Sequence, residues 1–379
     1  MVFTPTREAA LEKLDIFINE SLSDYSTKRN YDYGPENRSN TSCLSPYISH
    51  GVLSESEIIK KALNKYSFSK VEKFIQEVLW RTYWKGWLER RPTVWTSYVN
   101  DFDSQISKYK NDETYNRVIN SESNIECMND WISELKETGY LHNHTRMIFA
   151  SIWIFTLKLP WQLGAGLFLK YLFDGDPASN TLSWRWVGGI QTKGKHYIAQ
   201  SWNIEKFTNG KYSNVELNES PECLVEEISH ETIDPVMINA DFKLFKDLII
   251  FENTLYPELI DFINENFKQI TVIMPESSND CDTISENLLN FKQKLITNFL
   301  SKINKDISVN ILKIQQLQNF KDTNLCTIYP QIGKKLSYIK SKELNFNYLY
   351  KKIDIISNKY CKKGYFGFKK NINTILKAI

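Results

Sequence analysis

Two acids, an amide and two tryptophans lie close together in the segment YLFDGDPASNTLSWRWVGG. Asp174 and Asp176 can accept hydrogen bonds from the N–H or O–H groups of a ligand. Asn180 and Trp184 are four residues apart and share one face of a helix, whereas Trp186 points elsewhere. One indole can therefore lie beside whatever Asn180 contacts, while the other faces a separate cavity.

A second cluster lies in the segment QEVLWRTYWKGW, where Glu77, Trp80 and Trp84 share a helical face. For Trp84 we favour core packing. Trp80 can stack on an extruded base while Glu77 hydrogen-bonds to the edge of that base. The surrounding range Lys60–Arg91 holds nine basic residues against three acids. Such a run is usually a solvated face, but with interleaved aromatics it also suits single-stranded or flipped nucleic acid.

The segment NTSCLSPY places the hydroxyls of Thr41, Ser42 and Ser45 where a helix is about to begin. A helix N-terminus offers unpaired N–H groups and the positive end of the helix dipole. The pattern is consistent with a phosphate site, but taken alone it is more typical of plain helix capping.

The segment GYLHNHTRM brings an amide, a cation and a soft apolar side chain to the start of another helix. These are Asn143, Arg146 and Met147, which cluster on one side. His142 and His144 suggest a metal site, but no acid or cysteine ligand stands at a suitable spacing. The DGDPASN run also breaks the calcium-loop pattern. We therefore expect no metal.

Length and composition limit the class of protein. A chain of 379 residues favours two domains. A hydrophobic fraction of 42% with mixed charge fits a globular protein, and no apolar run approaches the roughly 18 residues needed to span a bilayer. The N-terminus lacks a signal pattern, and the six cysteines form no CxxC pair. We expect a cytoplasmic protein without disulfides or zinc.

Periodicity predicts two kinds of structure along the chain. Apolar residues at three- and four-residue spacing predict helices over 55–66, 69–91 and 144–159, the last ended by Pro160. No strand pattern precedes residue 210. Beyond it, strands are predicted at Asp247–Glu252, Gln269–Met274, Ser308–Lys313, Leu325–Tyr329 and Ile353–Ser357, with a helix over Thr283–Ile303. Alternating strands and helices predict a parallel α/β sheet, without the GxGxxG fingerprint.

An acidic segment separates the two kinds of structure. The range 213–241 holds eight acids and no Lys or Arg, so we interpret it as a linker between a helical domain, 1–212, and a smaller α/β domain, 242–379. All ten tryptophans and all nine arginines lie within the first 202 residues. The chemistry is therefore expected in the helical domain.

The motifs TSCLSPY, EVLWR, GYLHNHTRM and DGDPASNTLSWRW, in this order and spacing, resemble the flavin-binding domain of the DNA photolyase/cryptochrome family over roughly residues 20–210. The resemblance implies an all-α domain that holds FAD. It also implies that the photoexcited, reduced flavin gives an electron to a flipped pyrimidine dimer in UV-damaged DNA. The α/β domain, Rossmann-like and smaller, has no assigned role; it is either a permuted antenna-like domain or an unrelated interaction domain.

The resemblance assigns roles to individual residues. The cofactor-binding residues are Tyr25, Thr41, Ser42, Leu44, Ser45, Arg81, Asn143, Arg146, Asp174, Asp176 and Asn180, with Asn180 facing flavin N5. The residues that bind the dimer and DNA are Arg29, Glu77, Trp80, Asn143, His144, Met147 and Trp186. The catalytic residues are Glu77 and Asn180, together with the electron relay formed by Trp184 and Trp161. Tyr109 is the candidate for the third relay position.

The sequence departs from the family pattern at several points. Cys43 and His144 stand where arginines are usual, and no antenna-like segment precedes the helical domain. Whether a second chromophore binds, and whether single- or double-stranded DNA is preferred, stays open. The leading interpretation is a light-driven lyase acting on cyclobutane dimers as a monomer. A light sensor signalling through the C-terminal domain is the alternative, and a dark flavin oxidoreductase has little support.

Overall fold

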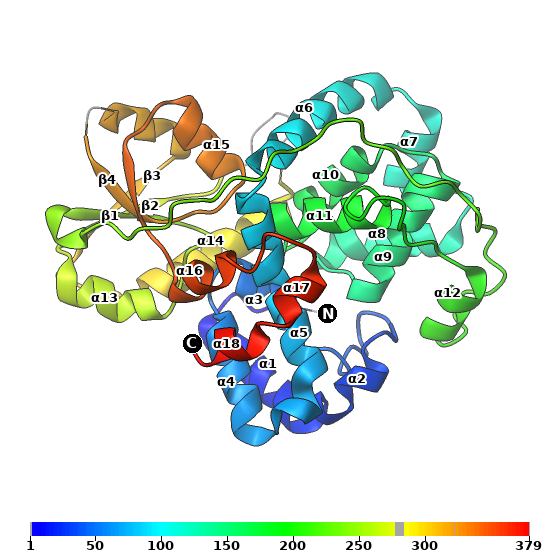
Figure 1. Ribbon diagram of the computed structural model, residues 1–379, viewed down its shortest axis with the longest axis horizontal. Helices are drawn as coiled ribbons and strands as arrows, with labels where there is room; N and C mark the ends of the chain where they lie inside the picture. The colour runs from blue at the N-terminus through cyan, green and yellow to red at the C-terminus, as the bar shows by residue number, and fades with distance from the viewer. Residues whose placement is uncertain (1, 277–283, 322, 379) are drawn as a thin grey trace.

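The computed structural model describes residues 2–276, 284–321 and 323–378. A helical part and an α/β part lie side by side (Figure 1). The helical part contains α1 (Arg7–Glu20), η1 (Leu22–Asp24), α2 (Tyr25–Lys28), α3 (Ser45–Ser49), α4 (Glu55–Lys65), α5 (Phe68–Glu89), α6 (Pro92–Tyr109), α7 (Glu113–Ile119), α8 (Glu126–Thr138), α9 (Asn143–Ser151), η2 (Ile152–Thr156), α10 (Trp161–Tyr171), α11 (Pro177–Val187) and α12 (Ser201–Phe207).

The remaining elements follow a long extended segment. They are η3 (Phe242–Leu244), β1 (Asp247–Phe251), α13 (Glu258–Asn266), β2 (Gln269–Ile273), α14 (Glu286–Leu300), β3 (Ser308–Leu312), η4 (Ile314–Phe320), β4 (Leu325–Ile328), α15 (Lys334–Ser341), β5 (Phe346–Leu349), α16 (Lys352–Asn358), α17 (Tyr365–Lys369) and α18 (Ile372–Leu376).

Local sequence explains where the long helices begin and end. The Ser54 side chain accepts a hydrogen bond from the backbone N–H of Glu57 and caps α4. Helix α5 starts after Ser67 and ends just before Pro92, which opens α6. The predicted helices 55–66 and 69–91 are confirmed. The third, 144–159, forms α9 and a π-helical continuation that ends at Thr156, before Pro160.

The five strands form one parallel sheet in the order β3-β2-β1-β4-β5. Four strands lie where the sequence predicted them, each ending one residue earlier. The helix predicted over Thr283–Ile303 is α14, although its first predicted residue lies outside the described residues.

One predicted strand is wrong. Residues Ile353–Ser357 form part of helix α16, and the fifth strand is Phe346–Leu349. The alternation of Ile353, Asp354 and Ile355 suggested a strand. In the fold, Ile353 and Ser357 are buried while Ile355 is 37% exposed. Burial at a spacing of four residues is the helical pattern, and it overrides the β-branched composition.

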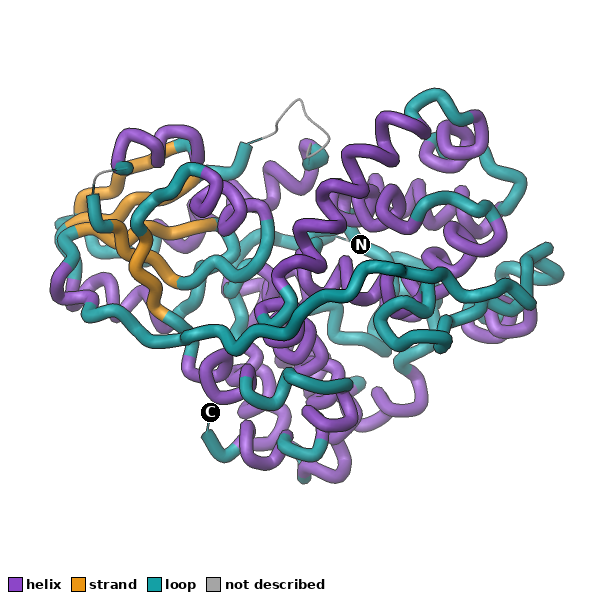
Figure 2. Tube along the Cα trace, turned by 45° about the horizontal axis from the view of Figure 1, so that its top comes forward, coloured by secondary structure: helices purple, strands orange, loops and turns teal. Residues whose placement is uncertain are grey.

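The acidic segment 213–241 contains no helix or strand. It runs along the helical part as an extended strap and is the long loop that crosses the molecule in Figure 2. Its acids pair with arginines beneath it. Glu226 binds Arg185 with an Oε2–Nη2 distance of 2.6 Å, and Asp234 pairs with Arg90. The backbone N–H of Ile233 donates to the carbonyl of Arg90 at 2.8 Å. The segment is therefore fixed to the helical part at several points.

One contiguous cluster of buried apolar side chains runs through both parts. Helix α14 of the α/β part contacts α1 and α10, and Phe291 stacks on Phe173 with ring centroids 4.5 Å apart. The imidazole of His50 contacts the carbonyl oxygens of Glu252 and Phe173 at 3.1 and 2.9 Å. After the sheet, the chain returns to the helical part, where α16 and α17 pack on α5 and α18 contacts α16 (Figure 1).

Candidate functional site

The hydroxyl-rich segment lies directly before a short helix, as predicted. Thr41 and Ser42 are half-buried and precede α3, whose first residue is Ser45. Leu44 is 1% exposed, and Cys43 adopts a left-handed conformation with φ 48°. The backbone therefore turns sharply at Cys43 and brings the polar side chains to the start of α3.

A buried ion network fixes the loop that carries this segment. Arg38 forms hydrogen bonds to both carboxylate oxygens of Asp32 at 3.0–3.1 Å, and Thr145 of α9 donates to Asp32 at 2.5 Å. Arg38 also pairs with Glu134 of α8 at 2.5 Å. Burial alone would raise the pKa of Asp32, but the Arg38 guanidinium and the hydrogen bonds from Thr145 and the backbone of Gly34 together hold that pKa below its usual value. The loop is thereby tied to α8 and α9.

The two aspartates of the opening motif lie at the turn from α10 into α11, and both are buried. Asp174 forms a 3.0 Å ion pair with Arg146 of α9. Its backbone carbonyl accepts a hydrogen bond from Ser49, which in turn accepts one from Arg81 at 2.8 Å. Burial alone would raise the pKa of Asp174, but Arg146, Arg81 and Ser45 together lower it below its usual value, so the carboxylate stays ionised.

Asp176 caps α11, because its Oδ1 accepts a 2.7 Å hydrogen bond from the backbone N–H of Ser179. Its Oδ2 lies 3.7 Å from Lys85 Nζ and 3.9 Å from Arg81 Nη1. Both cations offset the burial of Asp176, whose pKa is lowered. Sequence reasoning missed Lys85 and Ser49. The position of Lys85 could have been noticed, because it lies one helical turn after Arg81 and on the same face of the predicted helix.

Asn180 is buried in the middle of α11, and its orientation is set by one hydrogen bond. Its Nδ2 donates to the carbonyl oxygen of Ala165 in α10 at 2.9 Å. Within the described residues, its Oδ1 accepts no hydrogen bond. Because the amide nitrogen is engaged, the free carbonyl oxygen is an acceptor for a protonated ring nitrogen. This donor set fits the predicted contact with flavin N5.

The predicted base-binding pair lies on α5. Glu77 is half-buried, with Oε1 3.0 Å from Lys73 Nζ and 3.9 Å from Arg29 Nε. The indole of Trp80 stacks on the ring of Tyr365, with centroids 3.5 Å apart and planes 11° from parallel. Tyr365 belongs to α17, far along the chain, and nothing in the sequence pointed to it. Burial, with the Glu77 charge as a smaller cause, raises the pKa of the Tyr365 phenol.

The other predicted substrate residues are distributed over α9 and α11. Asn143 is exposed at the first position of α9, and Met147 is half-buried one turn later. His144 is buried, with Nε2 2.9 Å from the amide oxygen of Asn203. That hydrogen bond holds the imidazole inside the protein. Trp186 stacks on Tyr197, with centroids 5.9 Å apart.

Tyr25 occupies the edge of this region. Its ring contacts Phe17 and Phe74 with centroids 5.8 and 5.3 Å away. Burial raises the pKa of the Tyr25 phenol, with the Glu77 charge as the next cause. Tyr25 and Arg29 are therefore both brought near Glu77, although they were predicted to serve the cofactor and DNA respectively.

The predicted relay tryptophans are both buried. Trp184 contacts Phe168 and Trp153, with centroids 5.2 and 6.3 Å away. Trp161 contacts Tyr98, with centroids 5.6 Å apart. Tyr109 is half-buried, and its ring lies beneath the ammonium of Lys108.

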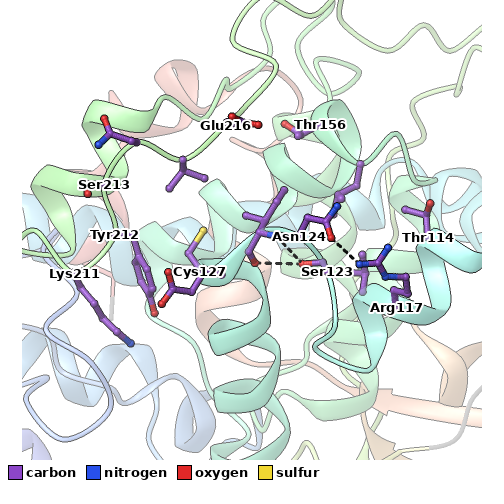
Figure 3. A pocket seen from close by; sticks show the side chains of 16 residues that line it. Thr114, Arg117, Ser123, Asn124, Cys127, Thr156, Lys211, Tyr212, Ser213 and Glu216 are labelled. Carbon is purple, nitrogen blue, oxygen red and sulfur yellow. Dashed lines mark hydrogen bonds between the residues drawn. The ribbon is translucent and has the colours of Figure 1, made fainter.

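The described residues form two surface pockets that none of the predicted cofactor- or DNA-binding residues lines. One, of about 570 Å³, is lined by residues such as Arg117, Cys127 and Tyr212, and none of the predicted site residues lines it (Figure 3). The other, of about 520 Å³, has Trp161 in its wall beside the strap residues Leu224 and Val225. Trp161 therefore adjoins a surface pocket although it is only 6% exposed.

The described part of the chain has neither a metal-binding cluster nor a membrane-spanning helix. Its His, Cys, Asp and Glu residues form no group of three or more suited to a metal ion. No helix among these residues is long and apolar enough to cross a membrane.

Comparison with known proteins identifies the helical part. Residues 74–214 match the model of the FAD binding domain of DNA photolyase. The deoxyribodipyrimidine photo-lyase of Agrobacterium fabrum is 30% identical over 191 residues, which are 50% of this chain and 39% of that protein. The enzyme of the same name from Alkalihalophilus pseudofirmus is 27% identical over 230 residues, 58% of this chain and 47% of that protein. The chain thus spans less than half the length of these relatives.

Among solved structures, a bacterial class III photolyase from Agrobacterium tumefaciens is similar with a TM-score of 0.44 and 26% identity, covering 55% of this chain and 44% of that one. An archaeal photolyase from Sulfolobus tokodaii has a TM-score of 0.43 and 22% identity, covering 54% and 44%. The match of residues 74–214 includes Glu77, Trp80, Arg146, Asp174 and Asn180. Residues 74–214 of the helical part therefore form an FAD-binding domain of the DNA photolyase kind, with FAD as its cofactor.

Proposed function

We propose that this protein is a photolyase that splits cyclobutane pyrimidine dimers in UV-damaged DNA. The observation that carries the proposal is the arrangement of α5. Glu77 and Trp80 suit a flipped base, and Arg81 joins the Asp174–Asp176 cluster through Ser49. These three α5 residues lie within five positions, about 6 Å along the helix axis. A dimer held by the first two would lie next to the cofactor.

The described residues fit FAD. Asp174 and Asp176 are ionised acceptors for the flavin ring and ribityl hydroxyl groups, and Arg146 holds Asp174 in place. The hydroxyls of Thr41, Ser42 and Ser45 lie at the start of α3, where phosphate oxygens would be favoured. Asn180 presents its amide oxygen. When bound and reduced, FAD supplies a light-excited electron for the cleavage of the dimer.

The chain's own residues would bind and orient the dimer. The Glu77 carboxylate accepts a hydrogen bond from a base N–H, and Trp80 and Trp186 offer apolar ring faces. Asn143, exposed at the start of α9, is free to donate or accept at a base edge. Met147 adds an adaptable apolar contact. The names of the relatives, all deoxyribodipyrimidine photo-lyases, support this assignment.

The test uses the full chain with chemically reduced flavin and an oligonucleotide that contains one thymine dimer. Under blue light, we expect absorbance of the restored thymines to rise, and no rise in the dark. Glu77→Ala is expected to slow repair by about 10- to 100-fold, because one charge-assisted hydrogen bond is worth about 1.5–3 kcal/mol. Flavin absorbance should stay at the wild-type level. Loss of flavin from that variant would show that Glu77 lines the cofactor site instead.

A light sensor is the second candidate, and one observation favours it. The C-terminal helices α16 and α17 pack on α5, the helix that carries Glu77 and Trp80, so a change there can reach the C-terminal part. Failure to restore thymine absorbance, with flavin bound and photoreducible, would favour the sensor over the lyase.

A further inference from the structure

The C-terminal segment Asn358–Lys369 lies along one face of α5. The Tyr83 hydroxyl donates to the carbonyl of Lys363 at 3.0 Å, and Arg90 donates to the carbonyl of Asn358 at 2.9 Å. Cys361 is so close that a Cβ at Gly86 would lie 2.5 Å from its sulfur. These contacts span much of the length of α5, so this segment is docked on the site-bearing helix.

Tyr365 is held firmly within this docked segment. It is 9% exposed, and its hydroxyl donates to the backbone carbonyl of Gln76 at 2.9 Å. Its ring also meets Tyr83 edge-on and stacks near Phe368, with centroids 5.3 and 5.9 Å away. A ring fixed at both its hydroxyl and its faces is a rigid platform.

The platform lies against the predicted base-stacking indole. Trp80 contacts Tyr365 face to face at 3.5 Å and Trp84 at 5.2 Å with a 39° tilt. With 3.6 residues per turn, Gln76, Tyr83, Gly86 and Arg90 share the α5 face that meets the C-terminal segment.

On the same helix, Glu77 and Arg81 lie about 100° and 140° around the axis from Gln76, and Trp80 lies between the two faces. Tyr365 therefore covers Trp80 from the side of the C-terminal segment, whereas Glu77 and Arg81 lie on its other side.

We propose that Tyr365 is a positioning residue for the substrate site: it fixes the plane of the Trp80 indole, and so sets how a flipped pyrimidine stacks. This rests on the proposed function. Without the Tyr365 ring, the Trp80 side chain gains rotamers that turn its face away from the base. The expected consequence is weaker binding of the damaged base, with no change in the cofactor.

The test compares three variants of the full chain. Tyr365→Ala removes the platform, and Tyr365→Phe keeps the ring but loses the hydroxyl. Phe368→Ala removes a buried ring of similar size from the same helix, whose contact is with Tyr83 and Tyr365. We expect Tyr365→Ala to weaken binding of a dimer-containing oligonucleotide by about tenfold, within the range measured for one base–aromatic stack. Tyr365→Phe should restore wild-type affinity, and flavin photoreduction should be unchanged throughout.

A spectroscopic readout is independent of DNA. With 5-fluorotryptophan incorporated, the Trp80 resonance is assigned by its loss in Trp80→Phe. Tyr365→Ala should shift and broaden this resonance, because the ring current of a stacked tyrosine is removed. Phe368→Ala should change it much less, because Tyr365 keeps its stack on Trp80 and its hydrogen bond to Gln76. An unmoved resonance in Tyr365→Ala, or an equal change in Phe368→Ala, would refute the proposal. If the wild type does not prefer damaged DNA, the proposed function fails, while the fluorine spectrum still decides whether Tyr365 fixes Trp80.

Discussion

Glu89, the last residue of α5, gives the protein a predicted pH-dependent stability. Its Oε2 accepts a hydrogen bond from the Tyr329 hydroxyl at 2.6 Å, and its Oε1 accepts one from the backbone N–H of Ile332 at 2.9 Å. Both partners belong to the loop after β4. The carboxyl group is 8% exposed, and burial raises its pKa to about 7 although both hydrogen bonds act in the opposite direction.

The sign and size of the effect follow from linkage. A pKa raised from the usual value of 4.5 to about 7 means that the folded state prefers the protonated acid. The stabilising contribution is complete below the unfolded pKa and is lost as pH rises through the folded one. The shift corresponds to about 3 kcal/mol at alkaline pH, since one pKa unit is about 1.4 kcal/mol.

The assay is urea unfolding of the wild type and of Glu89→Gln, at about pH 4.5 and about pH 8.5. Glutamine keeps the shape and can still accept from Ile332 and donate to the Tyr329 oxygen. We expect the difference in unfolding free energy between variant and wild type to rise by about 3 kcal/mol across this interval. Glu12→Gln, at an exposed position of α1, is the control and should show no such rise. A pH-independent difference for Glu89→Gln would refute the reasoning.

Four further outcomes are expected from the described contacts. Arg146→Ala leaves the buried Asp174 carboxylate without its ion-pair partner. We therefore expect the unfolding free energy to fall by about 3–5 kcal/mol and the purified variant to lose its flavin. A variant that co-purifies with as much flavin as the wild type would contradict this. Trp184→Phe should abolish photoreduction of oxidised flavin while pre-reduced enzyme still repairs, as followed by flavin absorbance. Tyr98→Phe should slow photoreduction more than Tyr109→Phe, because the ring of Tyr98 contacts the relay residue Trp161 with centroids 5.6 Å apart. Deletion of 242–379 should abolish flavin retention on gel filtration; a truncated protein that stays yellow would show that the helical part folds alone.

The sequence predicted the elements better than their contacts. Local patterns sufficed for α4, α5 and four strands, because period and capping act within a few residues. Ile353–Ser357 failed because a short β-branched run fits either period until its buried side is known. Within the site, Arg146 and Asp174 were both named in advance, and the structure pairs them. Tyr365 was beyond prediction, since its partner on α5 is 289 residues away in the chain.

That separation has a consequence for synthesis in the cell. During translation, α5 leaves the ribosome long before Tyr365 is made, so the face of α5 around Gly86 stays uncovered until residues 358–369 have been synthesised. Domains generally fold as units in order of synthesis, and exposed apolar surface invites aggregation. Here α5 would stay partly exposed until the segment that contains Cys361 and Tyr365 packs on it. We expect a ribosome-bound nascent chain stalled before residue 352 to remain protease-sensitive in α5, and flavin loading to follow release.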